Sequence, residues 1–156
     1  MNHTHHLPYS CYRGEICVAI TACVQPRRPI FINSDIVTTF VKILEDAVLR
    51  NSCVVPVYCF MPDHFHLMTK GLQETSDFWR AMLRFKQITG FWLSKHSSIR
   101  WQDNFYDHVL RRDEDFANQV RYIVNNPVRR GLVKNWQDYP FTGSIGFDLK
   151  ELLFAG

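Results

Sequence analysis

Long apolar runs are absent from this 156-residue sequence, and none approaches the roughly 20 residues that a membrane-spanning helix needs. The first residues, MNHTHHLPYS, lack the apolar region of a secretory signal. With seven Gly and seven Pro, the chain is also too poor in these residues to be a low-complexity sequence. We therefore expect a cytoplasmic protein that has no membrane partner.

Cysteine is scarce, and its spacing shows no paired pattern. The five cysteines include no CxxC pair, which argues against a zinc ribbon. Their odd number argues against a secreted disulfide framework. We expect all of them to be reduced and mostly buried as small hydrophobic residues. They are Cys11, Cys17, Cys23, Cys53 and Cys59.

Apolar residues are plentiful: 46% of the chain is hydrophobic and 14% is aromatic. This is enough to form one sizeable core, and it excludes a disordered chain. We find no internal repeat and no linker. The sequence predicts a single domain over residues 9–147, a flexible N-terminal tail over 1–8 and a C-terminal tail over 148–156.

The net charge of +3 is small, but it is unevenly distributed. Residues 80–134 hold 11 Lys/Arg and 5 Asp/Glu, a net charge of +6, whereas residues 1–79 hold 6 and 7, a net charge of −1. Aromatic residues are interleaved with the basic ones in the 80–134 stretch. Such a mixture suits a phosphate backbone with unstacked bases. The alternative is a solvated helix face beside the core.

The order of apolar patterns predicts an α+β fold. A strand, a helix, a hairpin of two strands, a second helix, a fourth strand and a third helix follow one another. This is the ferredoxin-like (split βαβ) order, an antiparallel sheet with helices on one face, plus a C-terminal helix. We expect strands at 15–24, 53–60, 64–70 and 105–111. We expect Ser34 to cap the first helix, Ser76 to open the second, and Asp113 to cap a third that Pro127 ends. Pro56 indicates an edge strand or a bulge.

Two histidines stand out on the third predicted strand. Residues i and i+2 of a strand point to the same face, so His64 and His66 can converge on one cation while Phe65 faces the opposite side. Imidazole with oxygen partners suits a divalent metal that keeps open positions. The alternative is a pair of surface histidines in a hairpin.

Tyr122 and Asn126 form the second candidate pair. Positions i and i+4 share a helical face, so the phenol and the amide point the same way. The amide oxygen can be a third metal ligand, with the phenol as a nucleophile beside the metal. Alternatively, Tyr122 is a core or rim aromatic and Asn126 ends the helix before Pro127.

Three blocks resemble those of one family. Residues 61–67, MPDHFHL, resemble the MP[ND]HxHL core of the HUH single-tyrosine transposases. Trp101-Gln102 with residues 105–111, FYDHVLR, resembles the next block, and residues 122–133, YIVNNPVRRGLV, resemble the YIxxNPVxxGLV helix end. The blocks occur in the family's order and with similar intervals. The REP-associated tyrosine transposases, relatives of the smallest insertion-sequence transposases, match best, over roughly residues 9–145.

This resemblance implies a ferredoxin-like core and a mechanism. The family uses Mg²⁺ or Mn²⁺, which here implies His64, His66 and Asn126 as ligands. It implies Tyr122 as the catalytic nucleophile that attacks single-stranded DNA, forms a 5′-phosphotyrosine and frees a 3′-hydroxyl. The reaction reverses to rejoin strands at hairpin-associated sites, as in REP or insertion-sequence ends. Relatives act as homodimers or as monomers.

The sequence differs from the usual family motif at two places, and it offers several candidate DNA-binding arginines. Position 63 is Asp where the motif also takes Asn, and we expect it to shape the turn. Positions 124–125 are Val-Asn in place of a more familiar His-bearing pair. The candidate DNA-binding residues, which neutralise phosphates, are Arg111, Arg112, Arg121, Arg129 and Arg130.

Two rival functions remain open. One is a domesticated, non-cleaving module that only binds single-stranded or hairpin DNA. The other is a metal-dependent hydrolase of a small phosphoester, which the lack of further carboxylate ligands in these motifs disfavours.

Overall fold

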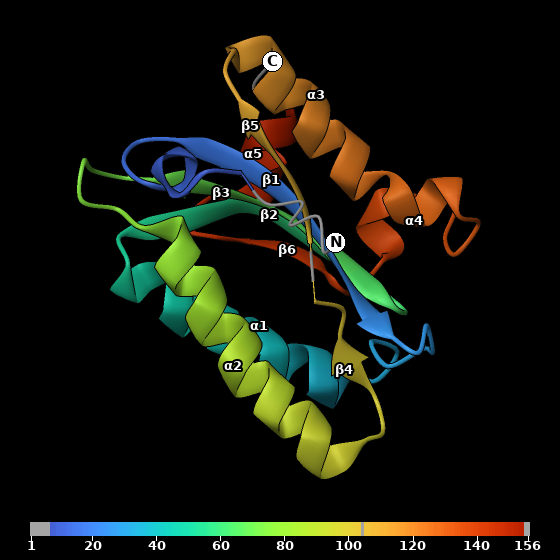
Figure 1. Ribbon diagram of the computed structural model, residues 1–156. Helices are drawn as coiled ribbons and strands as arrows, with labels where there is room; N and C mark the ends of the chain where they lie inside the picture. The colour runs from blue at the N-terminus through green and yellow to red at the C-terminus, as the bar shows by residue number, and fades with distance from the viewer. Residues whose placement is uncertain (1–6, 104, 155–156) are drawn as a thin grey trace.

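The computed structural model describes residues 7–103 and 105–154 and shows an antiparallel sheet with helices on both of its faces (Figure 1). The six strands are β1 (Cys17–Gln25), β2 (Cys53–Met61), β3 (His64–Gly71), β4 (Arg100–Trp101), β5 (Tyr106–Leu110) and β6 (Thr142–Ile145). The α-helices are α1 (Ser34–Arg50), α2 (Phe78–His96), α3 (Asp113–Val124), α4 (Asn126–Arg129) and α5 (Leu149–Phe154). Two short 3₁₀ helices are η1 (Tyr9–Tyr12) and η2 (Trp136–Asp138).

The strand order confirms the expected ferredoxin-like arrangement. β3 lies between β1 and β2 and is antiparallel to both, so β1 and β2 are parallel and joined by α1. β5 then pairs with the outer edge of β1. β6 extends the sheet beyond β2, and β4 pairs with the end of β1. The histidine-bearing strand β3 is therefore central, where neighbours on both sides hold it in register.

The larger core lies between the sheet and the α1–α2 layer (Figure 1). Phe65 on β3 is fully buried there, with its ring 5.1 Å from that of Phe60 and 5.5 Å from that of Phe85 on α2. α1 contributes a stripe at helical spacing that includes Phe40 and Leu44. Because side chains alternate along a strand, the burial of Phe65 directs its two neighbours to the other face.

That other face carries a second, smaller core under α3 and α5. Val120, Ile123 and Val124 of α3 are buried against residues of β2 and β3 such as Cys59 and Met68. Helices therefore cover part of both faces, as Figure 1 shows, with α1 and α2 on one side and α3, α4 and α5 on the other. This packing brings the tyrosine-bearing helix over the face on which His64 and His66 lie.

The helix starts differ by one residue from the sequence prediction. Asn33, not Ser34, caps α1, because its side chain accepts hydrogen bonds from the amides of Asp35 and Ile36. Asp77, not Ser76, caps α2 by accepting from the amide of Arg80. Asp113 is the first residue of α3 rather than its cap.

Ser76 has another role, which explains the second of these differences. Its hydroxyl accepts hydrogen bonds from the amides of Leu72 and Gln73 and donates to the carbonyl of Ser52. The serine thus closes the turn after β3, so the capping position falls on the next residue.

The bulge that Pro56 predicts is present, since the β2–β3 register shifts between Val54 and Val57. β2 is nevertheless no edge strand, because β6 pairs along its other side. No element was predicted in residues 135–147, and β6, β4 and both 3₁₀ helices are findings of the structure. Short strands such as β4 carry too few residues to show a period.

Both ends of the described chain contain ordered contacts. α5 falls within residues 148–156, and its Leu149 and Leu153 pack against the second core. At the other end, the amide of Leu7 donates to the hydroxyl of Tyr12. Residues 1–6 of the expected N-terminal tail lie outside the described residues. All five cysteines are free, and three of them are buried. Among the helices described, none is long and apolar enough to cross a bilayer.

Candidate active site

The two histidine side chains lie side by side on β3. The ring centroids of His64 and His66 are 4.9 Å apart, and the ring planes are nearly perpendicular at 89°. His64 is buried and His66 is half-buried. The strand geometry expected from the HxH pattern is thus present, on the sheet face opposite Phe65.

Each imidazole is held through its Nδ1 atom. Nδ1 of His64 lies 2.7 Å from Oδ1 of Asp63, and Nδ1 of His66 lies 2.7 Å from the Thr21 hydroxyl oxygen. A carboxylate can only accept, so His64 donates from Nδ1 and keeps a lone pair on Nε2. In the described part of the chain, neither Nε2 atom is hydrogen-bonded. This pattern, one nitrogen anchored and the other bare, is typical of metal-ligating histidines.

Asp63 is itself held by an arginine of the β1–α1 connection. Arg27 donates from Nε at 3.0 Å and from Nη2 at 3.3 Å to the two carboxylate oxygens. Burial alone raises the pKa of Asp63, but the hydrogen bonds from Arg27 and His64 outweigh it and lower the pKa below its usual value. Asp63 therefore remains charged and orients His64, a role beyond the turn-forming one expected from the sequence.

Both imidazoles are neutral near pH 7. Burial lowers the pKa of His64 and outweighs the opposing effect of Asp63. For His66, burial, the neighbouring His64 and the charges of Arg129 and Arg130 lower the pKa to about 4. A neutral imidazole is the form that binds a metal ion.

Asn126 lies at the start of α4 and is 5% exposed. Its Nδ2 is buried without a hydrogen-bond partner among the described residues. An unpaired buried amide of this kind costs about 1–3 kcal/mol. The partner that this nitrogen lacks is a hydrogen-bond acceptor, whereas a cation would be bound by the amide oxygen of Asn126.

Tyr122 occupies a different position from Asn126, since its side chain is 55% exposed. The Arg129 guanidinium lies over its ring, 3.9 Å from the centroid, and donates from Nη2 to the Tyr122 carbonyl at 2.7 Å. Tyr122 also lines a cavity of about 360 Å³ between α3 and β5, together with His108. Among the described residues, Tyr122 forms neither a hydrogen bond nor a ring contact with His64 or His66.

A helix boundary lies between Tyr122 and Asn126. α3 ends at Val124, Asn125 caps it, and α4 begins at Asn126. The two residues thus belong to successive helices rather than to one regular helix. The prediction that their side chains share one helical face assumed a single helix.

The candidate arginines divide into two groups. Arg129 and Arg130 are close enough to lower the pKa of His66, and Arg130 shares a cavity with His64. Arg111 and Arg112 are exposed between β5 and α3, where Arg112 pairs with Asp115 at 3.4 Å. Arg121 is exposed on α3. The structure therefore brings two of the five arginines to the histidines.

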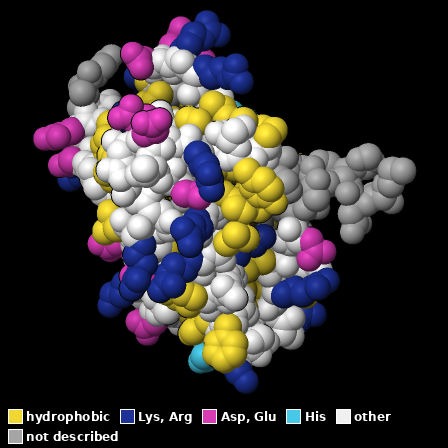
Figure 2. All heavy atoms as spheres, turned by 60° about the vertical axis from the view of Figure 1, so that its left-hand side comes forward, with side chains coloured by type: hydrophobic (Ala, Val, Ile, Leu, Met, Phe, Trp, Pro, Cys, Tyr) yellow, Lys and Arg dark blue, Asp and Glu magenta, His cyan; other side chains and the backbone are white. Residues whose placement is uncertain are grey.

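Charge elsewhere on the surface is mixed. Figure 2 shows one face on which several Lys and Arg side chains gather, with Asp and Glu around them. Ion pairs neutralise part of the positive charge, since Arg50 and Arg84 both pair with Asp46. In the described part of the chain, no group of three His, Cys, Asp or Glu side chains could hold a metal. A third protein ligand beside the histidine pair would therefore have to come from another kind of side chain or from the backbone.

The residues that sequence reasoning missed are Thr21 and Arg27. Thr21 pairs with His66 across the β1–β3 register, although 45 positions separate them in the chain. Only the pairing of β1 with β3 brings this hydroxyl to the ring, so no local pattern could have identified it.

An antiparallel α+β fold with a paired-histidine strand and a tyrosine-bearing helix over the same face defines a class of HUH-type proteins. Residues 14–126 of the chain match the model of the family described as "Transposase IS200 like". The chain belongs to this family, which confirms the resemblance seen in the three sequence blocks.

Two curated relatives are REP-associated tyrosine transposases. The Haemophilus influenzae protein, named as putative, is 31% identical over 62% of this chain and 61% of its own length. The Escherichia coli K12 protein is 29% identical over 70% of this chain and 67% of its own. The chain therefore spans about three fifths to two thirds of these relatives.

A solved structure supports the fold. A REP-associated tyrosine transposase, bound there to a REP hairpin, superposes with a TM-score of 0.68 at 24% identity. The match covers 90% of this chain and 82% of the other.

Proposed function

We propose that this protein is a metal-dependent transposase and endonuclease of single-stranded DNA. It cleaves and rejoins strands at hairpin-associated sites through a 5′-phosphotyrosine intermediate. Family membership supports the class of reaction. The observation that carries the proposal is the His64–His66 pair, whose Nδ1 atoms are both anchored while both Nε2 atoms are bare.

Three side chains would hold Mg²⁺ or Mn²⁺: the Nε2 atoms of His64 and His66, and the amide oxygen of Asn126. The two Nε2 atoms, which form no hydrogen bond in the described part of the chain, and the burial of Asn126 on a neighbouring helix end support this set. When bound, a divalent cation reduces the charge of the scissile phosphate and helps to align it for attack.

Tyr122 is the proposed nucleophile. Its phenol oxygen forms a bond to phosphorus as the bond from phosphorus to the 3′-oxygen breaks. The phenolic proton leaves to solvent, and the departing 3′-oxygen takes up a proton. The product keeps the phosphate ester, so attack by a 3′-hydroxyl reverses the step without an external energy source. Arg129, stacked on the ring, holds Tyr122 and brings positive charge to the phosphate.

The decisive experiment detects the covalent intermediate. The chain is incubated with Mn²⁺ and a library of single-stranded oligonucleotides that carry a hairpin and random flanks. We expect an SDS-resistant adduct whose peptide maps to Tyr122. Tyr122→Phe should bind the library and form no adduct, whereas Tyr106→Phe, a matched exposed tyrosine on β5, should form it normally. Binding without an adduct in the wild type would instead favour the non-cleaving module.

Complementation distinguishes a chain that uses its own Tyr122 from a homodimer in which the two subunits exchange tyrosines. Among the described residues, Tyr122 forms no hydrogen bond or ring contact with His64 or His66, so the structure leaves both arrangements to the test. If the tyrosine of one subunit serves the histidines of another, mixing Tyr122→Phe with His64→Ala restores adduct formation. If each chain acts alone, the mixture stays inactive.

A further inference from the structure

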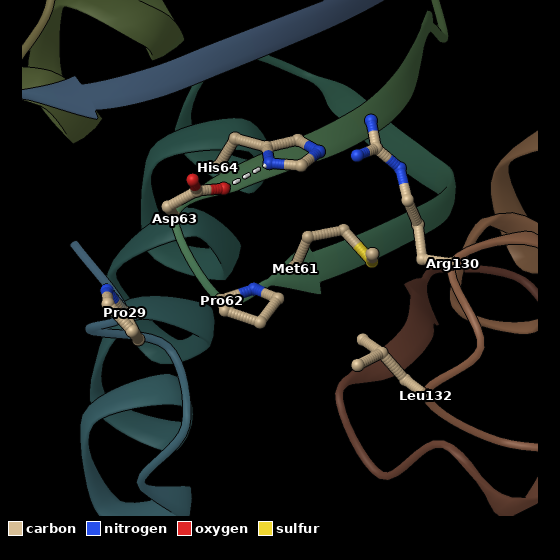
Figure 3. Close-up of a pocket in the computed structure, with 7 residues that line it drawn as sticks. All are labelled: Pro29, Met61, Pro62, Asp63, His64, Arg130 and Leu132. Atoms are coloured by element: carbon tan, nitrogen blue, oxygen red, sulfur yellow. Dashed lines mark hydrogen bonds and ion pairs between the residues drawn. The ribbon is translucent and has the colours of Figure 1, made fainter. Parts of the chain in front are cut away.

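A second cavity lies beside the histidine pair, away from Tyr122. Its volume is about 210 Å³ (Figure 3). Apolar side chains form most of its wall, and His64, Asp63 and Arg130 form the rest; the apolar members are Pro29, Met61, Pro62 and Leu132. In Figure 3, the His64 ring and the Arg130 guanidinium extend toward each other along one side of this space.

The wall is held in place by backbone hydrogen bonds from three parts of the chain. The carbonyl of Pro62 accepts from the amides of Ile30 at 2.8 Å and Phe31 at 3.0 Å, which ties the β1–α1 connection to the β2–β3 turn. The amide of Leu132 donates to the carbonyl of Pro127 at 2.9 Å. Gly131, with φ +74°, permits the turn that returns Leu132 toward the cavity. The cavity is therefore formed before any ligand binds.

Its size and chemistry select a small flat group. The volume exceeds the roughly 30 Å³ share of a water molecule and is smaller than the roughly 300 Å³ at which drug-sized pockets begin. The apolar side chains of the wall suit the faces of a nucleobase, which packs against them. Arg130 offers donors to the base edge or to a phosphate, and the Asp63 carboxylate offers an acceptor to the base edge.

The position of the cavity relative to Tyr122 decides which base it faces. The cavity lies at the β2–β3 turn, at the level of His64 on β3. The cavity beside Tyr122 is lined in part by His108 of β5. His108 pairs with Ala19 of β1, and Ala19 pairs with Met68 of β3, so this cavity lies level with Met68. Along β3, the two histidines thus separate the two cavities.

In phosphoryl transfer the attacking and leaving oxygens lie roughly in line on opposite sides of phosphorus. With the phosphate at the histidines and Tyr122 on one side, the leaving 3′-oxygen points toward the opposite side. We propose that the cavity of Pro29, Pro62, Met61 and Leu132 binds the base of the nucleotide that carries the leaving 3′-oxygen. This inference rests on the proposed function and adds to it a protein-built subsite for one base on the 5′ side of the cut.

Deoxynucleoside monophosphates test the subsite without cleavage. In a 3′-monophosphate, the phosphate models the scissile group and the base models the 5′-side nucleotide; a 5′-monophosphate models the other flank. The full chain, labelled at its methionine and leucine methyl groups, is titrated in Mg²⁺ with each. We expect the 3′-monophosphates to shift the methyl resonances of Met61 and Leu132, because the ring current of a base acts on both.

Controls separate the base from the phosphate. Inorganic phosphate alone should shift the His64 ring resonances and leave Leu132 unchanged. Leu132→Ala should weaken the binding of 3′-monophosphates about fivefold, in keeping with the stacking contribution of one base. Leu83→Ala, a similarly exposed leucine on α2, should leave binding unchanged.

Two results would overturn the inference. One is an equal shift of Leu132 by 5′- and 3′-monophosphates, and the other is no shift of Leu132 by any nucleotide. Either result is independent of the adduct assay, which reports on Tyr122. A chain that forms the adduct but shows no response at Leu132 refutes only the subsite.

Discussion

The carboxylate of Asp63 lies 2.7 Å from Nδ1 of His64, and Arg27 grips the same carboxylate with two nitrogens. This chain of contacts fixes the rotation of the His64 ring and leaves its Nε2 atom unoccupied by protein. The hydrogen bond to Asp63 sets the tautomer of His64 in which Nε2 can bind a cation.

Asp63→Ala is expected to weaken Mn²⁺ binding by about 10- to 100-fold, since His64 loses the acceptor that orients it. The affinity is measured by electron paramagnetic resonance of free Mn²⁺ during titration. Asp138→Ala, which changes an exposed aspartate in η2, is the matched control and should bind Mn²⁺ as the wild type does. Equal affinities for the two variants would show that Asp63 does not position a ligand.

Asn126→Ala separates metal binding from stability. The substitution removes a buried amide whose unpaired nitrogen costs about 1–3 kcal/mol, and this gain offsets the loss of packing. We expect the free energy of unfolding in urea to stay within about 1 kcal/mol of the wild type, while Mn²⁺ affinity falls. A large loss of stability with unchanged Mn²⁺ affinity would assign Asn126 a structural role instead.

Arg129 has two roles that substitution can distinguish. Arg129→Ala removes a phosphate-facing charge and should reduce the salt dependence of DNA binding by about one unit of slope. Arg129→Lys keeps the charge and loses the planar stack on Tyr122, so binding should persist while adduct formation slows. Filter binding at several salt concentrations and timed adduct assays measure the two effects. Arg121→Ala, at an exposed arginine on the preceding helix α3, should leave adduct formation near the wild-type rate.

Phe65 anchors the strand that carries the histidines. Phe65→Ala leaves a cavity among Phe60, Phe85 and Trp101 and should cost about 3–5 kcal/mol in urea unfolding. Phe91→Ala, at a phenylalanine that is 65% exposed on α2, should change stability by no more than about 0.5 kcal/mol. Similar losses for both variants would contradict the two-faced assignment of β3.

The order of elements could be predicted because each carries a local pattern. The β-branched run before Gln25 and the apolar stripe of α1 are visible in short windows, and Pro56 marks its own bulge. The cap of α2 was misplaced because Ser76 and Asp77 are both good capping residues. Which of them caps depends on Ser52, a residue 24 positions away whose carbonyl binds the Ser76 hydroxyl.

The sequence by itself determined the split βαβ order and placed His64 and His66 on one face of a strand, since strand periodicity is a property of the backbone. Tertiary structure alone decided that Thr21 anchors His66, that α3 covers the histidine face, and that Leu132 closes a cavity beside His64. These relationships join segments distant in the chain. They depend on which strands pair and how helices dock, and packing, rather than any local pattern, determines both.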